Sequence, residues 1–331
     1  MKGFEDLIGQ EEAISHIKNA ILMDRTSHAY IISGPEGAGK KSLAHLFAAA
    51  LQCEAGGIEP CGKCHSCTQM DTDSQPDVIT LVPKKTGLVS VDDIREQIVS
   101  DISIKPYSSS HKIYIVNDAQ TMNEQAQNAL LKTLEEPPEY GIIFLLATGE
   151  DAFLPTIRSR CVSLKLKPVS DEDIKKYLME KHGVPEDKAD VCAAFAQGAI
   201  GKALLLANSE DFAQIRSLVI ELMKRMEDID SYEMSMAINE AKKYNITEME
   251  YLDMVAVWFR DVLRFKATQD ANAVIFRDAT MDIMRQANHS SYSGIEEILE
   301  GIKKAGMRLR ANVSYELTME LLLETIKENI S

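Results

Sequence analysis

The sequence predicts an α/β domain built on a parallel sheet, followed by two helical domains. Short apolar runs alternate with helical patterns over the first ~165 residues, and a glycine-rich turn directly follows the first run. From about residue 208 onward every pattern is helical. We therefore divide the chain into residues 1–167, 168–207 and 208–331, with a change of character at Pro168.

Apolar runs in the first domain predict four strands, at residues 28–33, 77–82, 112–116 and 141–148, and we expect the third to be buried. Helical spacing predicts helices between them, including one over 92–100. Thr121 and Glu124 have the spacing of a capping box, which predicts that another helix starts there. Pro137 and Pro138 end that helix, because proline lacks the amide hydrogen and restricts the residue before it.

Helices account for the rest of the chain. Ser170 is the expected N-cap of the first helix in the second domain. In the third domain, apolar residues recur at helical spacing in three stripes, and we expect most of each stripe to form core. The stripes are Ile215, Val219, Leu222 and Met226; Leu252, Val255, Phe259, Val262 and Leu263; and Leu309, Val313, Leu317 and Leu321.

Composition excludes several classes of protein. The 331 residues carry a net charge of −15, and 45% of them are hydrophobic. No stretch approaches the roughly 18 consecutive apolar residues that a membrane span needs, and the first residues form no leader. We expect a soluble, cytoplasmic protein without a membrane partner. Its acidity predicts weak or no DNA binding by the chain alone, because duplex binding needs a basic surface.

A phosphate-binding loop is predicted between the first strand and the helix that follows it. The run Gly34-Pro-Glu-Gly37-Ala-Gly39-Lys40 has the required glycine spacing. Its glycines let backbone N–H groups converge on phosphate oxygens, and Lys40 would reach the β and γ phosphates. The position between strand and helix favours a nucleotide-binding loop over a chance glycine-rich turn.

Two positions that should bind Mg²⁺ carry the wrong residues. Lys41 stands where a Ser or Thr hydroxyl is needed, and an ammonium repels a cation. Asn117 stands where the third strand should end in aspartate, with Asp118 at the position of the catalytic base. If Asp118 were the metal residue, Ala119 would be the base, so hydrolysis fails in either register. Binding of ATP or ADP stays open, since Lys41 could replace the lost cation.

Four of the six cysteines, Cys53, Cys61, Cys64 and Cys67, crowd into one short segment. Their spacing can bring four thiolates to one tetrahedral Zn²⁺, and a full shell of protein ligands predicts a structural rather than a catalytic site. Such a group of cysteines in a cytosolic protein favours a metal over disulfides. An iron–sulfur cluster and free or redox thiols are the alternatives.

Together these features resemble the bacterial clamp-loader family of AAA+ proteins. Residues 4–10 (FEDLIGQ) are similar to the family's entry motif, which contacts adenine. The cysteine insertion after the phosphate-loop helix, the run over 128–138 (NALLKTLEEPP) and Ser159-Arg160-Cys161 also resemble the family's signatures. The resemblance covers residues 4–207, and the helical C-terminal third matches less sharply.

The resemblance implies an AAA+ domain with a zinc module at 53–67, a small helical lid, and a helical collar through which subunits assemble. In the family, the arginine of the Ser-Arg-Cys motif acts on a neighbour's ATP site, so Arg160 is the expected trans-acting arginine finger. Gly201 occupies the position of the motor subunit's sensor arginine, and Thr148 matches the family's polar sensor. Without the resemblance, Arg160 is a surface arginine and Thr148 a strand-end hydroxyl.

These features predict a non-hydrolysing stator subunit of the DNA polymerase III clamp loader. The implied partners are the motor (gamma/tau) and delta subunits and, through the assembly, the sliding clamp and primer–template DNA. The main alternative is an ATP-hydrolysing motor subunit, which Lys41, Asn117 and Gly201 oppose. A zinc-dependent DNA-binding module would bind DNA by itself, and a helicase-like AAA+ motor would need intact metal ligands.

Overall fold

The computed structural model describes residues 3–84, 87–244 and 247–330. The chain forms two compact units. The α/β unit comprises Met1–Tyr177 and Gln197–Lys202, and the helical unit comprises Leu178–Ala196 and Ala203–Ser331. The three-domain division at 167 and 207 remains a prediction, because compactness alone does not define functional domains.

A five-stranded parallel sheet forms the centre of the α/β unit, in the order β2-β3-β4-β1-β5. The strands are β1 (Ala29–Ser33), β2 (Val78–Thr80), β3 (Lys112–Val116), β4 (Gly141–Ala147) and β5 (Val162–Lys165). The four predicted strands are confirmed, although β2 is shorter than its apolar run. β5 was not predicted: it is an edge strand with alternating exposure, and only Leu164 is fully buried.

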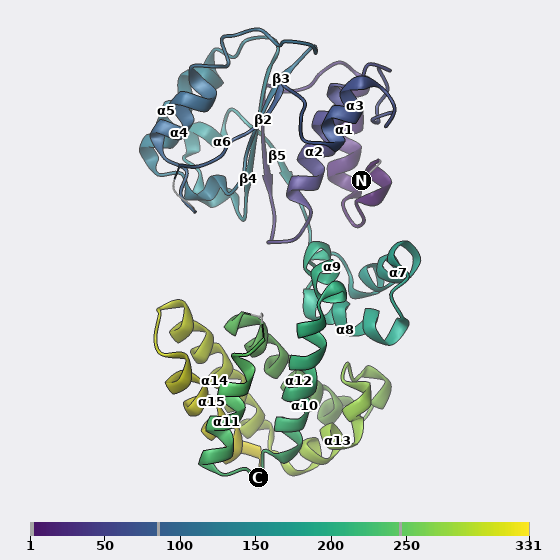
Figure 1. Cartoon of the computed structure of the whole chain (residues 1–331), viewed down its shortest axis with the longest axis vertical. Helices are drawn as coiled ribbons and strands as arrows, with labels where there is room; N and C mark the ends of the chain where they lie inside the picture. Colours follow the sequence, from purple (N-terminus) through teal and green to yellow (C-terminus); the bar gives the residue numbers. More distant parts are fainter. Residues whose placement is uncertain (1–2, 85–86, 245–246, 331) are drawn as a thin grey trace. The chain divides into compact units, whose positions relative to one another are not determined.

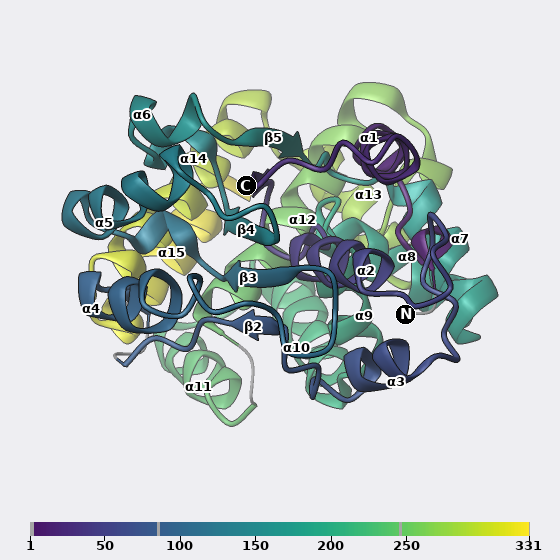
Figure 2. The ribbon, with the colours of Figure 1, turned by 90° about the horizontal axis from the view of Figure 1, so that it is seen from above.

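Helices cover both faces of the sheet (Figures 1 and 2). One face carries η1 (Phe4–Asp6), α1 (Glu11–Leu22), α2 (Lys40–Leu51) and α3 (His65–Asp71). The other carries α4 (Val91–Ile94), the π-helical turn η2 (Arg95–Val99), η3 (Ala119–Thr121), α5 (Glu124–Glu135), η4 (Glu150–Ala152) and α6 (Pro155–Arg158). The predicted helix over 92–100 therefore corresponds to α4 and η2.

Alternate residues of each strand enter two separate apolar clusters, as the two-residue period of a strand requires. Tyr30 and Ile32 of β1 join the cluster beneath α1 and α2. Ile31 joins the cluster beneath α4 and α5 on the opposite face. The central strands are thus buried on both sides, which explains their continuous apolar sequences.

The start of α5 differs from the prediction. Asn123, not Thr121, is the N-cap, and its side chain accepts a 2.9 Å hydrogen bond from the N–H of Ala126. Thr121 closes η3 instead, where its hydroxyl donates to the carbonyl oxygen of Asp118 at 2.8 Å. The predicted capping box is therefore wrong by two residues, while the predicted helix and its end before Pro137 are confirmed.

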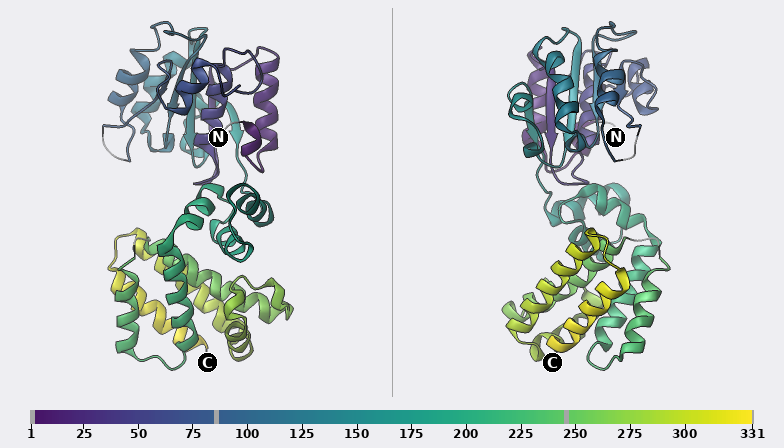
Figure 3. Two further views of the ribbon diagram at one scale, coloured as in Figure 1. Left: turned by 45° about the vertical axis from the view of Figure 1, so that its right-hand side comes forward. Right: turned by 90° about the vertical axis from the view of Figure 1, so that its left-hand side faces the viewer.

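Two helices contain residues of both units, α7 (Asp171–His182) and α9 (Ile200–Asn208). Ser170 accepts a 3.1 Å hydrogen bond from the N–H of Asp173, as its predicted N-cap role requires. The helical unit also contains α8 (Glu186–Ala196), α10 (Glu210–Arg225), α11 (Ser231–Ala241), α12 (Glu248–Thr268), η5 (Ala271–Ala273), η6 (Arg277–Ala279), α13 (Thr280–His289), α14 (Tyr292–Arg310) and α15 (Tyr315–Ile330). Figure 3 shows α14 and α15 lying side by side.

The core of the helical unit confirms two of the three predicted stripes. The stripe on α10 is buried, and so is the stripe on α12 except for the half-buried Leu263. Trp258 donates a 2.7 Å hydrogen bond to Gln286, which in turn donates to the carbonyl oxygen of Met223, so α10, α12 and α13 are joined. The third stripe is wrong: α14 ends at Arg310, and Val313, Leu317 and Leu321 are exposed.

Candidate functional site

The predicted phosphate loop lies between β1 and α2, at the carboxyl edge of the sheet. Gly37 and Gly39 have positive φ angles of 73° and 92°, which disfavour residues with a side chain. At Gly34, an added Cβ would lie 3.0 Å from the backbone oxygen of Leu166. The glycine spacing therefore serves local backbone geometry in this chain, whatever the loop binds.

Lys40 points back into its own loop. Its Nζ donates 2.7 Å hydrogen bonds to the carbonyl oxygens of Gly34 and Pro35. Burial lowers the pKa of this lysine, against the opposing effects of Glu36 and Asp118. The ammonium that would meet the β and γ phosphates is thus bonded to two oxygens of the loop.

The segment that follows α8 contacts the phosphate loop within the α/β unit. Gly201 donates through its backbone N–H to the carbonyl oxygen of Gly37 at 3.0 Å. Gly198, with a φ of 83°, accepts a 2.9 Å hydrogen bond from the N–H of Val169. A Cβ on Gly198 would lie 2.5 Å from the Cβ of Pro168, so this close approach depends on glycine.

Lys41 and Asn117 line one groove of about 430 Å³ beside the loop, together with Ser42, His45, Met70, Asp71, Asp73, Thr80 and Ile115. The Asn117 Oδ1 is buried and has no hydrogen-bond partner among the described residues. The two residues that replace the expected Mg²⁺ ligands therefore come together in space. An ammonium and an amide are a poor pair of ligands for a hard divalent cation.

Gln120 links two other predicted site residues. Its side-chain amide donates to Asp118 Oδ1 at 3.4 Å, and its Oε1 accepts a 3.3 Å hydrogen bond from the N–H of Thr148. Asp118 has a left-handed backbone with a φ of 48°, and both Asp118 and Thr148 are exposed. Sequence reasoning missed Gln120, because a glutamine in a short turn carries no recognisable signal.

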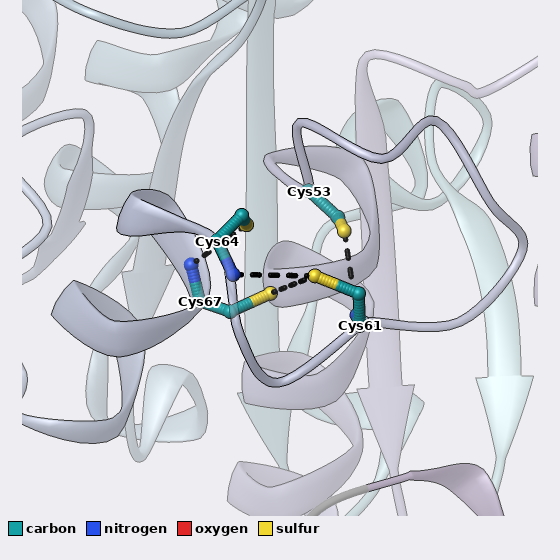
Figure 4. A group of neighbouring side chains, drawn as sticks. All are labelled: Cys53, Cys61, Cys64 and Cys67. Atoms are coloured by element: carbon teal, nitrogen blue, oxygen red, sulfur yellow. Dashed lines mark hydrogen bonds between the residues drawn. The ribbon is translucent and has the colours of Figure 1, made fainter.

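The four clustered cysteines come from the loop that follows α2, which contains Cys53 and Cys61, and from the start of α3, where Cys64 is the N-cap (Figure 4). Their Sγ atoms all lie within 4.8 Å of one another, and those of Cys61 and Cys67 are 3.9 Å apart. Four thiolates bound tetrahedrally at about 2.3 Å from one ion would be separated by about 3.8 Å. The described residues therefore hold a cysteine cluster whose geometry could bind a metal ion.

Backbone N–H groups surround these sulfurs. The N–H of Cys61 donates to the sulfur of Cys53 at 3.3 Å, that of Cys64 to Cys61 at 3.3 Å, and that of Cys67 to Cys64 at 3.4 Å. Hydrogen bonds from Lys63 and Cys64 lower the pKa of the Cys61 thiol to about 6. Burial raises the pKa of Cys67 to about 12. A bound cation would favour the thiolate form at all four positions.

Arg160 follows α6 and contacts the last turn of α5. Its Nη2 lies 2.8 Å from Glu135 Oε1, while Nη1 donates to the carbonyl oxygen of Thr156 at 2.9 Å and to Ser159 Oγ at 3.2 Å. About a third of the arginine side chain remains exposed. Glu135 was not predicted as a site residue, because the sequence does not indicate which arginine a helix-end carboxylate will meet.

Within the described ranges, no helix is long and apolar enough to cross a membrane.

The family model and the curated relatives that match this chain are subunits of DNA polymerase III. A family model for DNA polymerase III, delta subunit, matches residues 9–170. The tau subunit of DNA polymerase III from Bacillus subtilis (strain 168) is 31% identical over 316 residues, which are 86% of this chain and 55% of that protein. The delta' subunit of the same organism is 29% identical over 324 residues, which are 96% of each chain.

The first of these relatives is much longer than this chain. The chain spans about half the length of the tau subunit, but nearly the whole of the delta' subunit. Among solved structures, a DNA polymerase III gamma subunit-related protein from Thermotoga maritima aligns with a TM-score of 0.50 at 18% identity. The alignment covers 96% of this chain and 100% of that one, and it shows a shared fold.

Proposed function

This chain belongs to the clamp-loader family of DNA polymerase III subunits, and we propose that it is a non-hydrolysing stator of the delta-prime type. One observation carries the proposal: Lys41 and Asn117 line the same groove where an ATPase places two Mg²⁺ ligands. Phosphoryl transfer depends on metal ions that neutralise charge on the transferring phosphate. With an ammonium at that place, we expect turnover close to background.

Hydrogen bonds within the phosphate loop also support a subunit that does not hydrolyse ATP. Lys40 already donates to two loop carbonyls, and Gly201 contributes a backbone N–H rather than a guanidinium. A nucleotide would have to replace the hydrogen bonds of Lys40 with bonds to its own phosphates. We propose that ATP or ADP, if bound at all, is held without catalysis.

Arg160 supplies the chemistry in this proposal, but at another subunit's site. A guanidinium near a transferring phosphoryl group can raise turnover by ~10³–10⁵ in well-studied GTPases. The partially exposed Arg160 at the end of α6 is suited to this trans-acting role. The proposed partners are motor (gamma/tau) and delta subunits, with which the chain would load a sliding clamp onto primer–template DNA in the cytoplasm.

The cysteine cluster is proposed to hold structural Zn²⁺. Sulfurs within 4.8 Å of one another have room for one ion, but not for several iron and sulfide atoms. Four protein ligands close the coordination shell, so no position remains for a reacting water. Bound zinc would fix the insertion that follows the phosphate-loop helix α2.

Hydrolysis of ATP distinguishes this proposal from a motor subunit, a rival favoured by the 31% identity to the tau protein. We would measure turnover with Mg²⁺ by the purified chain, and by a motor subunit mixed with wild-type chain or with Arg160→Ala. The proposal expects background turnover by the chain alone and a large loss in the Arg160→Ala mixture. Turnover by the isolated chain that survives contamination controls would make it a motor subunit.

DNA binding tests the third possibility. With a net charge of −15, the isolated chain is expected to bind primer–template DNA weakly or not at all. A zinc-dependent DNA-binding module would instead bind tightly by itself and lose affinity steeply with salt. Titration at two salt concentrations separates the two functions.

A further inference from the structure

Arg160 is restrained on one side and open on the other. Its three hydrogen bonds, to Glu135, Thr156 and Ser159, use three of the five N–H donors of a guanidinium. Two donors therefore remain for a ligand outside this set. A planar guanidinium with two unused donors can still form a two-point contact with a phosphate.

Glu135 is an unusual residue for the place it occupies. It is the last residue of α5, where the helix dipole and the unpaired carbonyl groups disfavour a carboxylate. Capping does not explain an acid at this end of the helix. The 2.8 Å ion pair with Arg160 is the contact that does.

The neighbouring arginine provides a comparison on the same short segment. Arg158 lies 3.6 Å from Asp151, and the side chain of Asp151 is fully exposed. Arg158 thus has a loose partner at the surface, while Arg160 has a short bond to a helix end and two further bonds to its own turn. Only Arg160 is held in one orientation by several contacts.

We infer that Glu135 is a positioning residue, which holds the Arg160 guanidinium in the orientation that receives the phosphoryl group of a neighbouring subunit's nucleotide. This inference rests on the proposed function of Arg160. The carboxylate holds Nη2 of the guanidinium, and the carbonyl of Thr156 holds Nη1, so the plane of the group is fixed from two sides. Glu135 itself touches neither nucleotide nor metal.

The test uses the chain assembled with its motor and delta subunits. We would compare wild type, Glu135→Gln, Glu135→Asp and Arg160→Ala, with Glu136→Gln as the matched control, since Glu136 is the adjacent exposed acid. Glu135→Gln is expected to lower the kcat of ATP hydrolysis by ~10-fold, because small misplacements of a catalytic group cost up to about 10²-fold. The KM for ATP, subunit assembly and the thermal midpoint should not change.

Two further comparisons make the result decisive. The double variant Glu135→Gln/Arg160→Ala should be no slower than Arg160→Ala, because Glu135 acts only through Arg160. Glu135→Asp, which keeps the charge, should recover part of the lost kcat. Multiplied losses in the double variant, or an equal loss in Glu136→Gln, would overturn the inference.

The outcomes separate the inference from the proposed function. If Arg160→Ala leaves motor turnover unchanged, the trans-acting role fails and the inference fails with it. If Arg160→Ala lowers turnover but Glu135→Gln does not, the proposed function stands and only the positioning role is wrong. A higher kcat in Glu135→Gln would also contradict it, because the carboxylate would then restrain Arg160 rather than position it.

Discussion

The backbone N–H of Gly201 and the carbonyl oxygen of Gly37 form a 3.0 Å hydrogen bond, so the segment that follows α8 is attached to the phosphate loop. A Cβ on Gly201 would lie 3.3 Å from that oxygen, closer than most such contacts. A side chain at this position would therefore require the loop backbone to shift by a few tenths of an ångström.

The close packing at Gly198 can be tested by stability. Gly198→Ala should reduce the free energy of unfolding by about 3 kcal/mol, since it combines a left-handed backbone with a 2.5 Å clash against Pro168. Gly183→Ala is the matched control, because Gly183 has a φ of 64° but open space around its Cβ position. It should cost only about 1 kcal/mol. Urea unfolding followed by circular dichroism measures both, and equal losses would exclude a steric contribution.

Restoring the metal ligands should restore metal dependence. In wild type, Mg²⁺ should not improve ADP affinity, because the ammonium of Lys41, which lines the groove together with Asn117, repels a cation. Lys41→Thr/Asn117→Asp should bind ADP about tenfold more tightly with Mg²⁺ than without it, which corresponds to about 1.4 kcal/mol. Calorimetric titrations of the double variant and each single variant test this. A wild-type chain that already prefers Mg·ADP would contradict the reading of Lys41.

Metal content tests the cysteine cluster. Purified wild type should contain one zinc per chain, and Cys61→Ser should contain almost none, because three thiolates and a hydroxyl bind Zn²⁺ far more weakly. Cys161→Ser is the control, since Cys161 lies outside the cluster. Elemental analysis gives the ratio, and iron in place of zinc would contradict the zinc proposal. Zinc removal by a chelator should also lower the thermal midpoint.

Asp261 should make the helical unit less stable as the pH rises. Burial raises the pKa of its carboxyl to about 6 from 3.8, although the N–H groups of Phe276 and Ile275 oppose this. The folded state then binds the proton more tightly than the unfolded state. Its stabilising effect is complete below pH ~3.8 and disappears as the pH rises through about 6. Between pH 5 and 7.5 the loss should be about 1.4 kcal/mol.

The measurement is unfolding followed by fluorescence of Trp258, the single tryptophan, which lies in the helical unit. Asp261→Asn should flatten the pH dependence, since the amide stays neutral. Asp228→Asn, at an exposed position, serves as the control and should keep the wild-type dependence. A wild-type protein that becomes more stable from pH 5 to 7.5 would show that another group dominates.

The sequence predicted most of the fold because its central strands are continuous apolar runs. β3 and β4 are buried along their whole length, so no alternation was needed to find them. β5 was not predicted, because its four residues include the polar Ser163 and Lys165 and form no apolar run. The third helical stripe was wrong because the helix is interrupted at Asn312. This residue has a left-handed backbone, with a φ of 58°, and lies in the turn between α14 and α15.

The candidate site was predictable in its residue types but not in its contacts. Local spacing identified the phosphate loop and the four cysteines, and the structure brings each set together. The sequence cannot predict that Lys40 donates to carbonyl oxygens of its own loop, because the motif is the same whether the lysine contacts phosphate or peptide oxygen. Glu135 and Arg160 are 25 positions apart, so their pairing requires the tertiary fold.

The two apolar clusters flanking the sheet have a consequence for how such a protein can arise. Neither cluster includes Lys41, Asn117, Asp118 or Thr148, which lie at the carboxyl edge of the sheet. Substitutions that abolish chemistry at this edge are therefore expected to leave both apolar clusters intact. A gene copy encoding this architecture could lose its own reaction in single steps and still deliver a correctly shaped partner to an assembly.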